Sequence, residues 1–261
     1  MSHFNSMGKS FVRNAGFTMI EFMIAGTLGL FLIMGVIQLF LGSSQNYRVQ
    51  DDLAIMQEDG RLALMYMKDQ IQRASWTPDY LNIPPAIDFT QSADAATDTV
   101  AIQYNMNVDG IENVDCNGNN VATGQIINTF SLNANNELAC RGNGGGGSQP
   151  LIANVADFQV LYGVDTVSAG GCASGQVARY LNATDVVSEG LTDKVISVRL
   201  GILLVSDGDV LPEDTAKSFQ VMDTVVNSND RLIRRMFQQT IFMPNAVLAT
   251  AANPQTSIDC L

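Results

Sequence analysis

Residues 17–41 read FTMIEFMIAGTLGLFLIMGVIQLFL, an apolar run in which Glu21 is the only ionisable side chain. At about 1.5 Å per residue, a helix of this length is roughly 37 Å long and exceeds the roughly 30 Å hydrocarbon core of a bilayer. A carboxylate within a spanning helix is costly unless it lies near the interface or finds a partner. The run therefore predicts a membrane-spanning helix and makes Glu21 a candidate functional residue.

The residues before this run form the short leader MSHFNSMGKSFVRNAG, which contains two basic residues and no acidic one and ends in Gly16. A basic leader, Gly16, Phe17 and then Glu21 inside an apolar helix resembles the class III signal of type IV pilins and type II secretion pseudopilins. The resemblance implies that a prepilin peptidase cleaves between Gly16 and Phe17 and that Phe17 becomes the methylated N-terminus. An unprocessed membrane anchor is the alternative interpretation of the same residues.

The same resemblance assigns Phe17, Thr18 and Glu21 to assembly. It implies that the Glu21 carboxylate pairs with the N-terminal amine of a neighbouring subunit. This is physically reasonable because a buried cation and a buried carboxylate are each costly alone and much less so together.

The distribution of charge indicates topology and limits the possible partners. Lys9 and Arg13 precede the apolar run and Asp51 and Asp52 follow it, so the positive-inside rule places the N-terminus in the cytoplasm and the remaining chain across the membrane. Removal of residues 1–16 leaves 12 Lys and Arg against 26 Asp and Glu, a formal net charge of −14. Such a charge disfavours general nucleic-acid binding but leaves room for a local basic patch.

The histidine and cysteine content restricts the chemistry. His3 is the only histidine and lies in the leader, so a cleaved chain has no Ser-His-Asp or Cys-His catalysis and no histidine-bearing zinc site. The cysteines, Cys116, Cys140, Cys172 and Cys260, include no CxxC pair and predict disulfides in an oxidising compartment. The preferred pairing joins Cys116 to Cys140 and Cys172 to Cys260, and the other two pairings remain open.

The helix is expected to continue past the membrane, because no proline occurs between Phe17 and Trp76. Over residues 42–76, apolar and small residues recur at spacings of three and four. They are Leu53, Met56, Gly60, Ala63, Leu64, Met67, Ile71 and Ala74. This stripe favours packing against the protein's own folded domain over a partner site, with a helix end at about Ala74.

The segment from Ile37 to Leu64 looks like the one that marks the PilW family of minor pilins, which J-type pseudopilins resemble in architecture. The matching residues are Gln38, Phe40, Tyr47, Arg48, Gln50, Asp51, Gln57, Glu58, Gly60 and Arg61. Asp59 stands where family members commonly carry Asn. The resemblance implies a pilin-like α+β fold, with a long N-terminal helix whose second half packs on antiparallel β-sheet.

Residues 77–261 are predicted to form a β-rich globular domain, with the number of sheets left open. Alternation predicts strands over 100–106, 126–132, 137–140, 155–162, 194–205, 218–226 and 234–243. Asn133–Asn136 predicts a turn between the second and third of these. The family's last strand usually ends near an Arg-Asn pair, which Pro244-Asn245 replaces here, and the residues beyond it are predicted to be an irregular tail.

Two motifs imitate ligand sites. Gly142–Ser148 reads GNGGGGS but lacks the Lys-Ser/Thr of a phosphate loop, which predicts a flexible loop. Asn105, Asn107, Asp109 and Gly110 imitate the start of a calcium loop, but its twelfth position is Cys116 rather than Glu. Ordinary Asx turns explain these residues, so no cofactor or metal is predicted.

The favoured function is that of a minor pilin, which is not an enzyme. The resemblance implies a priming or tip complex that initiates filament polymerisation, with effects on twitching, adhesion or DNA uptake. It also implies other minor pilins, the major pilin, the inner-membrane assembly platform, prepilin peptidase and membrane lipid as partners. The protein would be a single-pass inner-membrane protein with a periplasmic domain before assembly, and would lie in the filament or at its tip afterwards.

Two other classes compete with this interpretation. A J-type pseudopilin of a type II secretion system would share the fold and the processing and differ in its partners. A membrane-anchored periplasmic enzyme or binding protein would need a site built from carboxylates alone. The best carboxylates for it, Asp207 and Asp209 around Gly208, fit a turn after a strand better.

Overall fold

The computed structural model describes residues 16–79, 82–106, 113–122, 124–165 and 174–251. It divides into two compact units, residues 1–48 and 49–261, and the boundary falls within helix α1, which runs from Met19 to Gln72. The remaining helices are α2 (Ala183–Ser188), the short 3-10 helix η1 (Thr192–Lys194) and α3 (Pro244–Ala251). The strands are β1 (Val100–Asn105), β2 (Gln125–Leu132), β3 (Leu138–Gly142), β4 (Gln149–Ile152), β5 (Val155–Val164), β6 (Arg179–Leu181), β7 (Val195–Val205), β8 (Thr215–Val221), β9 (Thr224–Asp230) and β10 (Arg234–Phe242).

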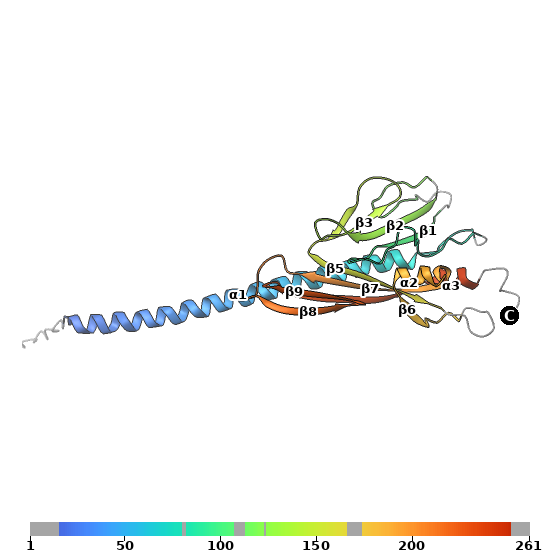
Figure 1. The fold of residues 1–261 in the computed structure, drawn as a ribbon. Helices are drawn as coiled ribbons and strands as arrows, with labels where there is room; N and C mark the ends of the chain where they lie inside the picture. The colour runs from blue at the N-terminus through green and yellow to red at the C-terminus, as the bar shows by residue number, and fades with distance from the viewer. Residues whose placement is uncertain (1–15, 80–81, 107–112, 123, 166–173, 252–261) are drawn as a thin grey trace, which may run out of the picture. The chain divides into compact units, whose positions relative to one another are not determined.

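The described residues of the second unit form three antiparallel sheets. One has the strand order β1-β2-β3-β4, one the order β10-β7-β5-β6, and β8 and β9 form a two-stranded ribbon. The second half of α1 lies between the sheet of β1–β3 and the sheet of β5 and β7 (Figure 1). The predicted α+β architecture, a long helix packed on antiparallel sheet, is therefore confirmed.

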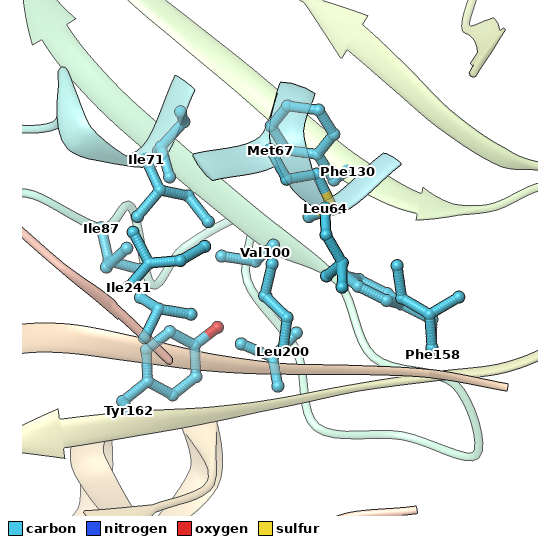
Figure 2. Close-up of a cluster of buried hydrophobic side chains, with 14 of the residues drawn as sticks. Leu64, Met67, Ile71, Ile87, Val100, Phe130, Phe158, Tyr162, Leu200 and Ile241 are labelled. Atoms are coloured by element: carbon cyan, nitrogen blue, oxygen red, sulfur yellow. The ribbon is translucent and has the colours of Figure 1, made fainter. Parts of the chain in front are cut away.

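The predicted apolar stripe forms the helical side of the core. Met56, Gly60, Ala63, Leu64, Met67 and Ile71 are buried, as the spacing predicts, and Met67 and Ile71 have no exposed surface. Leu64, Met67 and Ile71 belong to one hydrophobic cluster with Phe130 of the first sheet and Phe158 and Leu200 of the second (Figure 2). Burying an apolar side chain of this size contributes about 1.5–3 kcal/mol, so the helix and both sheets stabilise one another.

The end of α1 is bound by a side chain at the start of α3. Ser75 adopts a φ of 62°, which ends the helical path, and Asn245 at the start of α3 donates its Nδ2 to the carbonyls of Gln72 and Ala74 at 3.2 Å. The last carbonyls of a helix have no partner within the helix, so Asn245 supplies one from a distant segment. The residue pair Pro244-Asn245 thus has a structural role of its own.

Several elements differ from the sequence predictions. The single strand predicted over 218–226 is wrong, because β8 and β9 meet there in a two-residue turn at Met222–Asp223. Met222 has a φ of 53°, a position that glycine usually occupies, so the usual turn signal is missing. Part of the predicted irregular tail is helical, since Pro244 suits a first helical position. β4, β6 and α2 were not predicted either.

The glycine-rich segment between β3 and β4 is a loop, and side chains of a second loop form hydrogen bonds with it. Gly144 donates its N–H to Asp115 Oδ2 at 2.8 Å, and the carbonyls of Gly145 and Gly147 accept from the side chains of Asn119 and Asn117 at 2.6 and 2.9 Å. These bonds join two loops that are distant in sequence.

At Gly60 the backbone of α1 approaches the ring of Phe237 on β10. A Cβ atom at residue 60 would lie 2.7–2.8 Å from three ring carbons of Phe237, closer than real contacts allow. Glycine is therefore required at this crossing, even though it lowers intrinsic helix stability.

We expect Gly60→Val to lower the free energy of unfolding by about 1–3 kcal/mol, because the new side chain overpacks the contact with Phe237. The measurement is urea unfolding of the full chain in detergent, followed by fluorescence of Trp76, the single tryptophan. Ala54→Val, at an exposed position of the same helix, is the control. It should lower the free energy of unfolding only by the small difference in helix propensity between alanine and valine. Equal losses in the two variants would contradict the steric explanation.

Asp98 is a buried carboxylate beside the second sheet. Its side chain is 2% exposed and accepts hydrogen bonds from the N–H groups of Val160 at 2.8 Å and Ala95 at 3.0 Å. Burial raises the pKa of Asp98 from 3.8 to about 6, since the two hydrogen bonds compensate only in part and Asp94 and Asp223 add repulsion. The folded chain therefore binds a proton at pH values where the unfolded chain has lost it.

We expect the free energy of unfolding to fall as the pH rises from about 4 through 6, because the charged form of Asp98 is disfavoured only in the folded state. Asp98→Asn removes this titration and should reduce the slope. Asp193→Asn, which changes a side chain that is 67% exposed, should leave the slope of stability against pH unchanged. Urea unfolding at pH 4.5, 5.5 and 7 on all three chains measures the slopes, and an unchanged slope in Asp98→Asn would exclude this carboxylate as its source.

Candidate functional site

The residues predicted to act in assembly form a local capping structure at the start of α1. Glu21 Oε2 accepts hydrogen bonds from the backbone N–H of Thr18 at 2.9 Å and from its hydroxyl at 3.0 Å. The Thr18 hydroxyl in turn accepts from the N–H of Glu21 at 3.4 Å. This is a capping box, in which the two side chains satisfy donors of the first helical turn.

The capping box occupies one carboxylate oxygen of Glu21 and leaves the other available. Among the described residues, no group donates to Oε1 of Glu21. Phe17 lies directly before Thr18 and is 89% exposed. Thr18 therefore orients the Glu21 carboxylate, while Oε1 remains able to accept from a group outside the chain.

The apolar side chains that follow are exposed as well. No part of the most apolar stretch of α1 is buried within the described residues. The exposed large side chains of residues 17–41 are Phe17, Met19, Ile20, Phe22, Met23, Ile24, Leu28, Leu30, Phe31, Leu32, Ile33, Met34, Val36, Ile37, Leu39, Phe40 and Leu41. Exposed apolar surface of this extent needs lipid or other apolar helices around it. In the described part of the chain, α1 is the one helix long and apolar enough to cross a membrane.

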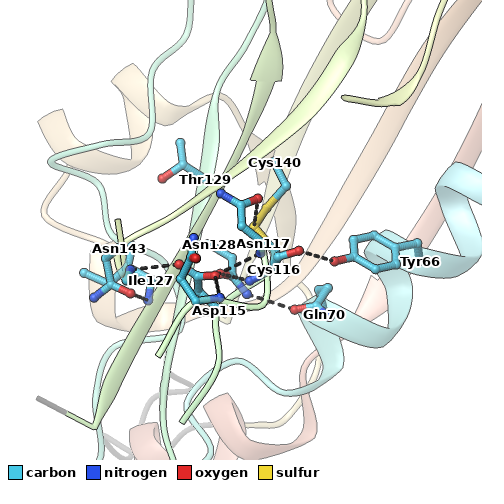
Figure 3. The surroundings of a disulfide bond; sticks show 12 residues. Tyr66, Gln70, Asp115, Cys116, Asn117, Ile127, Asn128, Thr129, Cys140 and Asn143 are labelled. Atoms are coloured by element: carbon cyan, nitrogen blue, oxygen red, sulfur yellow. Dashed lines mark hydrogen bonds between the residues drawn. A yellow bond between two sulfur atoms is a disulfide. The ribbon is translucent and has the colours of Figure 1, made fainter. Parts of the chain in front are cut away.

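The predicted cysteines Cys116 and Cys140 form a disulfide, which a cluster of polar side chains surrounds (Figure 3). This is the preferred pairing from the sequence, and it ties the loop before β2 to β3. The backbone N–H of Cys116 donates to Asn128 Oδ1 at 2.9 Å, and Tyr66 donates its hydroxyl to the carbonyl of Cys116 at 3.5 Å. The bridge is thus connected to both the first sheet and α1.

Asn128 continues this network into the interior. Its Nδ2 donates to Gln70 Oε1 at 2.9 Å, and Asn128 has no exposed surface. Gln70 was not predicted as a core residue, because an amide at that position looks like part of the polar side of the helix. Its buried partner on β2 becomes visible only when the sheet is in place.

The remaining predicted residues contribute less to a site. Cys172, Cys260, Asn107, Asp109 and Gly110 lie outside the described residues, as does most of the leader. Within the described part, no group of three or more His, Cys, Asp or Glu side chains is arranged to hold a metal ion. Asp207 and Asp209 lie after β7, where they contact Asn154 and Arg231.

We expect Cys116→Ala with Cys140→Ala to lower the free energy of unfolding by about 2–4 kcal/mol, because the bridge restricts the unfolded chain. Urea unfolding of the full chain in detergent, monitored at Trp76, measures the loss. Each single substitution should cost about as much as the pair, since either one removes the whole bridge. Additive losses would show that the cysteines contribute by packing and not by their bond.

Comparisons with known proteins find one matching family and a similar solved structure. The model of the family "Type IV Pilus-assembly protein W" matches residues 119–245, which extend from the disulfide loop to the start of α3. No curated protein matches the chain by sequence. The structure is similar to that of a type IV-like pilin from Thermus thermophilus, with 14% sequence identity, a TM-score of 0.46, and coverage of 77% of this chain and 98% of that one.

The family match and the sequence resemblance rest on different residues. The resemblance was drawn from residues 9 to about 75, above all from Ile37 to Leu64, and these lie outside the matched range. The matched range holds strands β2–β10 and Cys140, whereas α1 and Cys116 lie before it. Over residues 119–245 the chain matches the PilW family of type IV pilus-assembly proteins.

Proposed function

We propose that this protein is a minor pilin whose N-terminal helix enters the helical bundle of a type IV pilus and which acts in a priming or tip complex that initiates polymerisation. The proposal includes prepilin peptidase cleavage between Gly16 and Phe17. The observation that carries it is the Glu21 carboxylate, oriented by Thr18 and open at Oε1, at the head of an exposed apolar helix in a chain that matches the PilW family.

The chemistry of this segment supports docking of one helix head against another. The N-terminal amine that cleavage would create at Phe17 is a cation, and Oε1 of a neighbouring Glu21 is an acceptor for it. In an apolar bundle the two charges lose their water, so a hydrogen-bonded pair is strongly favoured over either charge alone. A contact in which the head of one subunit binds a different point on the next does not close on itself and extends into a filament.

The family match favours the pilus over a type II secretion pseudopilus. Other minor pilins, the major pilin and the inner-membrane assembly platform are the proposed partners. Before assembly the protein would lie in the inner membrane with residues 49–261 in the periplasm. Twitching, adhesion and DNA uptake are the downstream processes that such a subunit affects.

The proposal is tested by the intact mass of the protein isolated from its own host, together with a count of surface pili in wild-type and Glu21→Ala cells. We expect a mature chain that begins at Phe17 and carries one added methyl group. Glu21→Ala should be processed in the same way and should strongly reduce pili, because the amine of the neighbouring subunit loses its carboxylate.

Glu213→Ala, which removes an exposed carboxylate from the second unit, is the matched control and should leave pili unchanged. A chain that retains residues 1–16, with normal pili in Glu21→Ala cells, would refute the proposal. Normal pili together with loss of secretion in the mutant would instead assign the protein to a secretion pseudopilus.

A further inference from the structure

The strand β10 has a free edge. In the sheet order β10-β7-β5-β6 it is an outer strand, and it pairs only with β7. Its nine residues, Arg234–Phe242, make it longer than most edge strands, which proteins keep short or cover. An uncovered edge of this kind exposes backbone donors and acceptors that another strand can bind.

The pairing register identifies which backbone groups are unpaired. Met243 donates its N–H to the carbonyl of Ile196, and Ser206 donates its N–H to the carbonyl of Ile233, both at 2.9 Å. The backbone N–H and C=O groups of the odd-numbered residues of β10 therefore point toward β7. The backbone groups of the even-numbered residues then point away from the sheet, and none of them makes a hydrogen bond within the described part of the chain. They are Arg234, Met236, Gln238, Thr240 and Phe242.

A groove lies beside this edge on the outer face of the sheet. It has a volume of about 610 Å³ and is lined by side chains of β5, β7 and β10 and by the β8–β9 ribbon. Among them are the amides of Gln220 and Gln238, the hydroxyl of Thr240 and the guanidinium of Arg199. Phe242, at the end of the edge, is 45% exposed and offers an apolar contact.

Two arginines flank this edge, Arg199 on the groove face of the sheet and Arg235 on the opposite face, which Phe237 shares. The protein has a net charge of −12, yet Arg199 and Arg235 have no carboxylate partner among the described residues. Arg199 stacks 3.8 Å from the ring centroid of Tyr180 and donates its Nε to Thr240 at 3.2 Å, which holds it in the groove. Arg235 lies over the ring of Phe237 at 5.8 Å.

We propose that β10 is a docking edge for an acidic, extended segment of another polypeptide. The segment adds as a fifth strand, donating to and accepting from the outward backbone groups of Met236, Gln238 and Thr240. Its side chains on the outer face enter the groove, where a carboxylate meets Arg199, and a carboxylate on the opposite face of the added strand meets Arg235. The inference goes beyond the proposed role in the pilus and does not require it.

The test places the photoreactive amino acid benzoylphenylalanine at Phe242 in the full chain, expressed in its own host, and maps the crosslinks by mass spectrometry. We expect crosslinks to a segment of another polypeptide that contains Asp or Glu. Gln238→Pro removes the outward N–H without breaking the ladder to β7 and should lower the crosslink yield about tenfold. Gln238→Ala keeps this N–H and should retain the yield, and Arg235→Glu should reduce it.

Trp76 fluorescence and hydrogen exchange distinguish a lost docking edge from a misfolded chain. If Gln238→Pro proves unfolded, hydrogen exchange of the wild-type chain gives the test instead. The backbone amides of Gln238 and Thr240 should exchange more slowly in membrane extracts of the host cells than in the purified chain. Four outcomes would each overturn the proposal. Two concern the crosslinks at Phe242: a frequency no higher than from benzoylphenylalanine placed at Glu213, or crosslinks only to β10 of a second copy. The others are an unaltered yield in a folded Gln238→Pro chain and amides of Gln238 and Thr240 that are not protected from exchange. Specific crosslinks in cells where Glu21→Ala leaves pili normal would support this edge while refuting the pilus role.

Discussion

The second half of α1 must bury one apolar stripe against two sheets at once, and the rest of the second unit depends on this constraint. Met67 and Ile71 have no exposed surface, because they lie in one core with Phe130 of the first sheet and Leu200 of the second. The helix and strands of both sheets contribute side chains to one hydrophobic cluster. The close approach at Gly60 has the same origin, since a side chain there would hold α1 away from β10.

Polar contacts determine where the helix lies along the sheets more than how strongly it binds them. The bond between Gln70 and Asn128 contributes about 0.5–1.5 kcal/mol when made, but a buried amide without a partner costs more, so other positions of the helix are penalised. The disulfide loop and Asn245 act in the same way at two further points. Together they connect residues from α1, from the first sheet and from the end of the last strand.

The two contacts proposed above use different surfaces of the protein. The first half of α1 is apolar and exposed, and its one carboxylate is oriented by Thr18, which suits contacts in a membrane or a helical bundle. The second unit is acidic, but its β10 edge combines unpaired backbone groups with Arg199 and Arg235, which suits contact with an extended acidic chain. A subunit that enters an assembly through its helix can in this way retain a separate surface for a different partner.

The sequence by itself determined the elements whose signals are local. The length of the apolar run, the spacing of the buried stripe, the alternation in β7 and the turn at Asn133–Asn136 each depend on a few neighbouring residues, and all appear in the structure. The Thr18 and Glu21 pair is equally local. The tertiary structure alone decided the number of sheets, the burial of Gln70 and the cap at Asn245, because their partners lie tens of residues away or more. It also decided the turn at Met222 and the free edge of β10, since a positive φ at a methionine and the absence of a neighbouring strand follow from packing and leave no local pattern in the sequence.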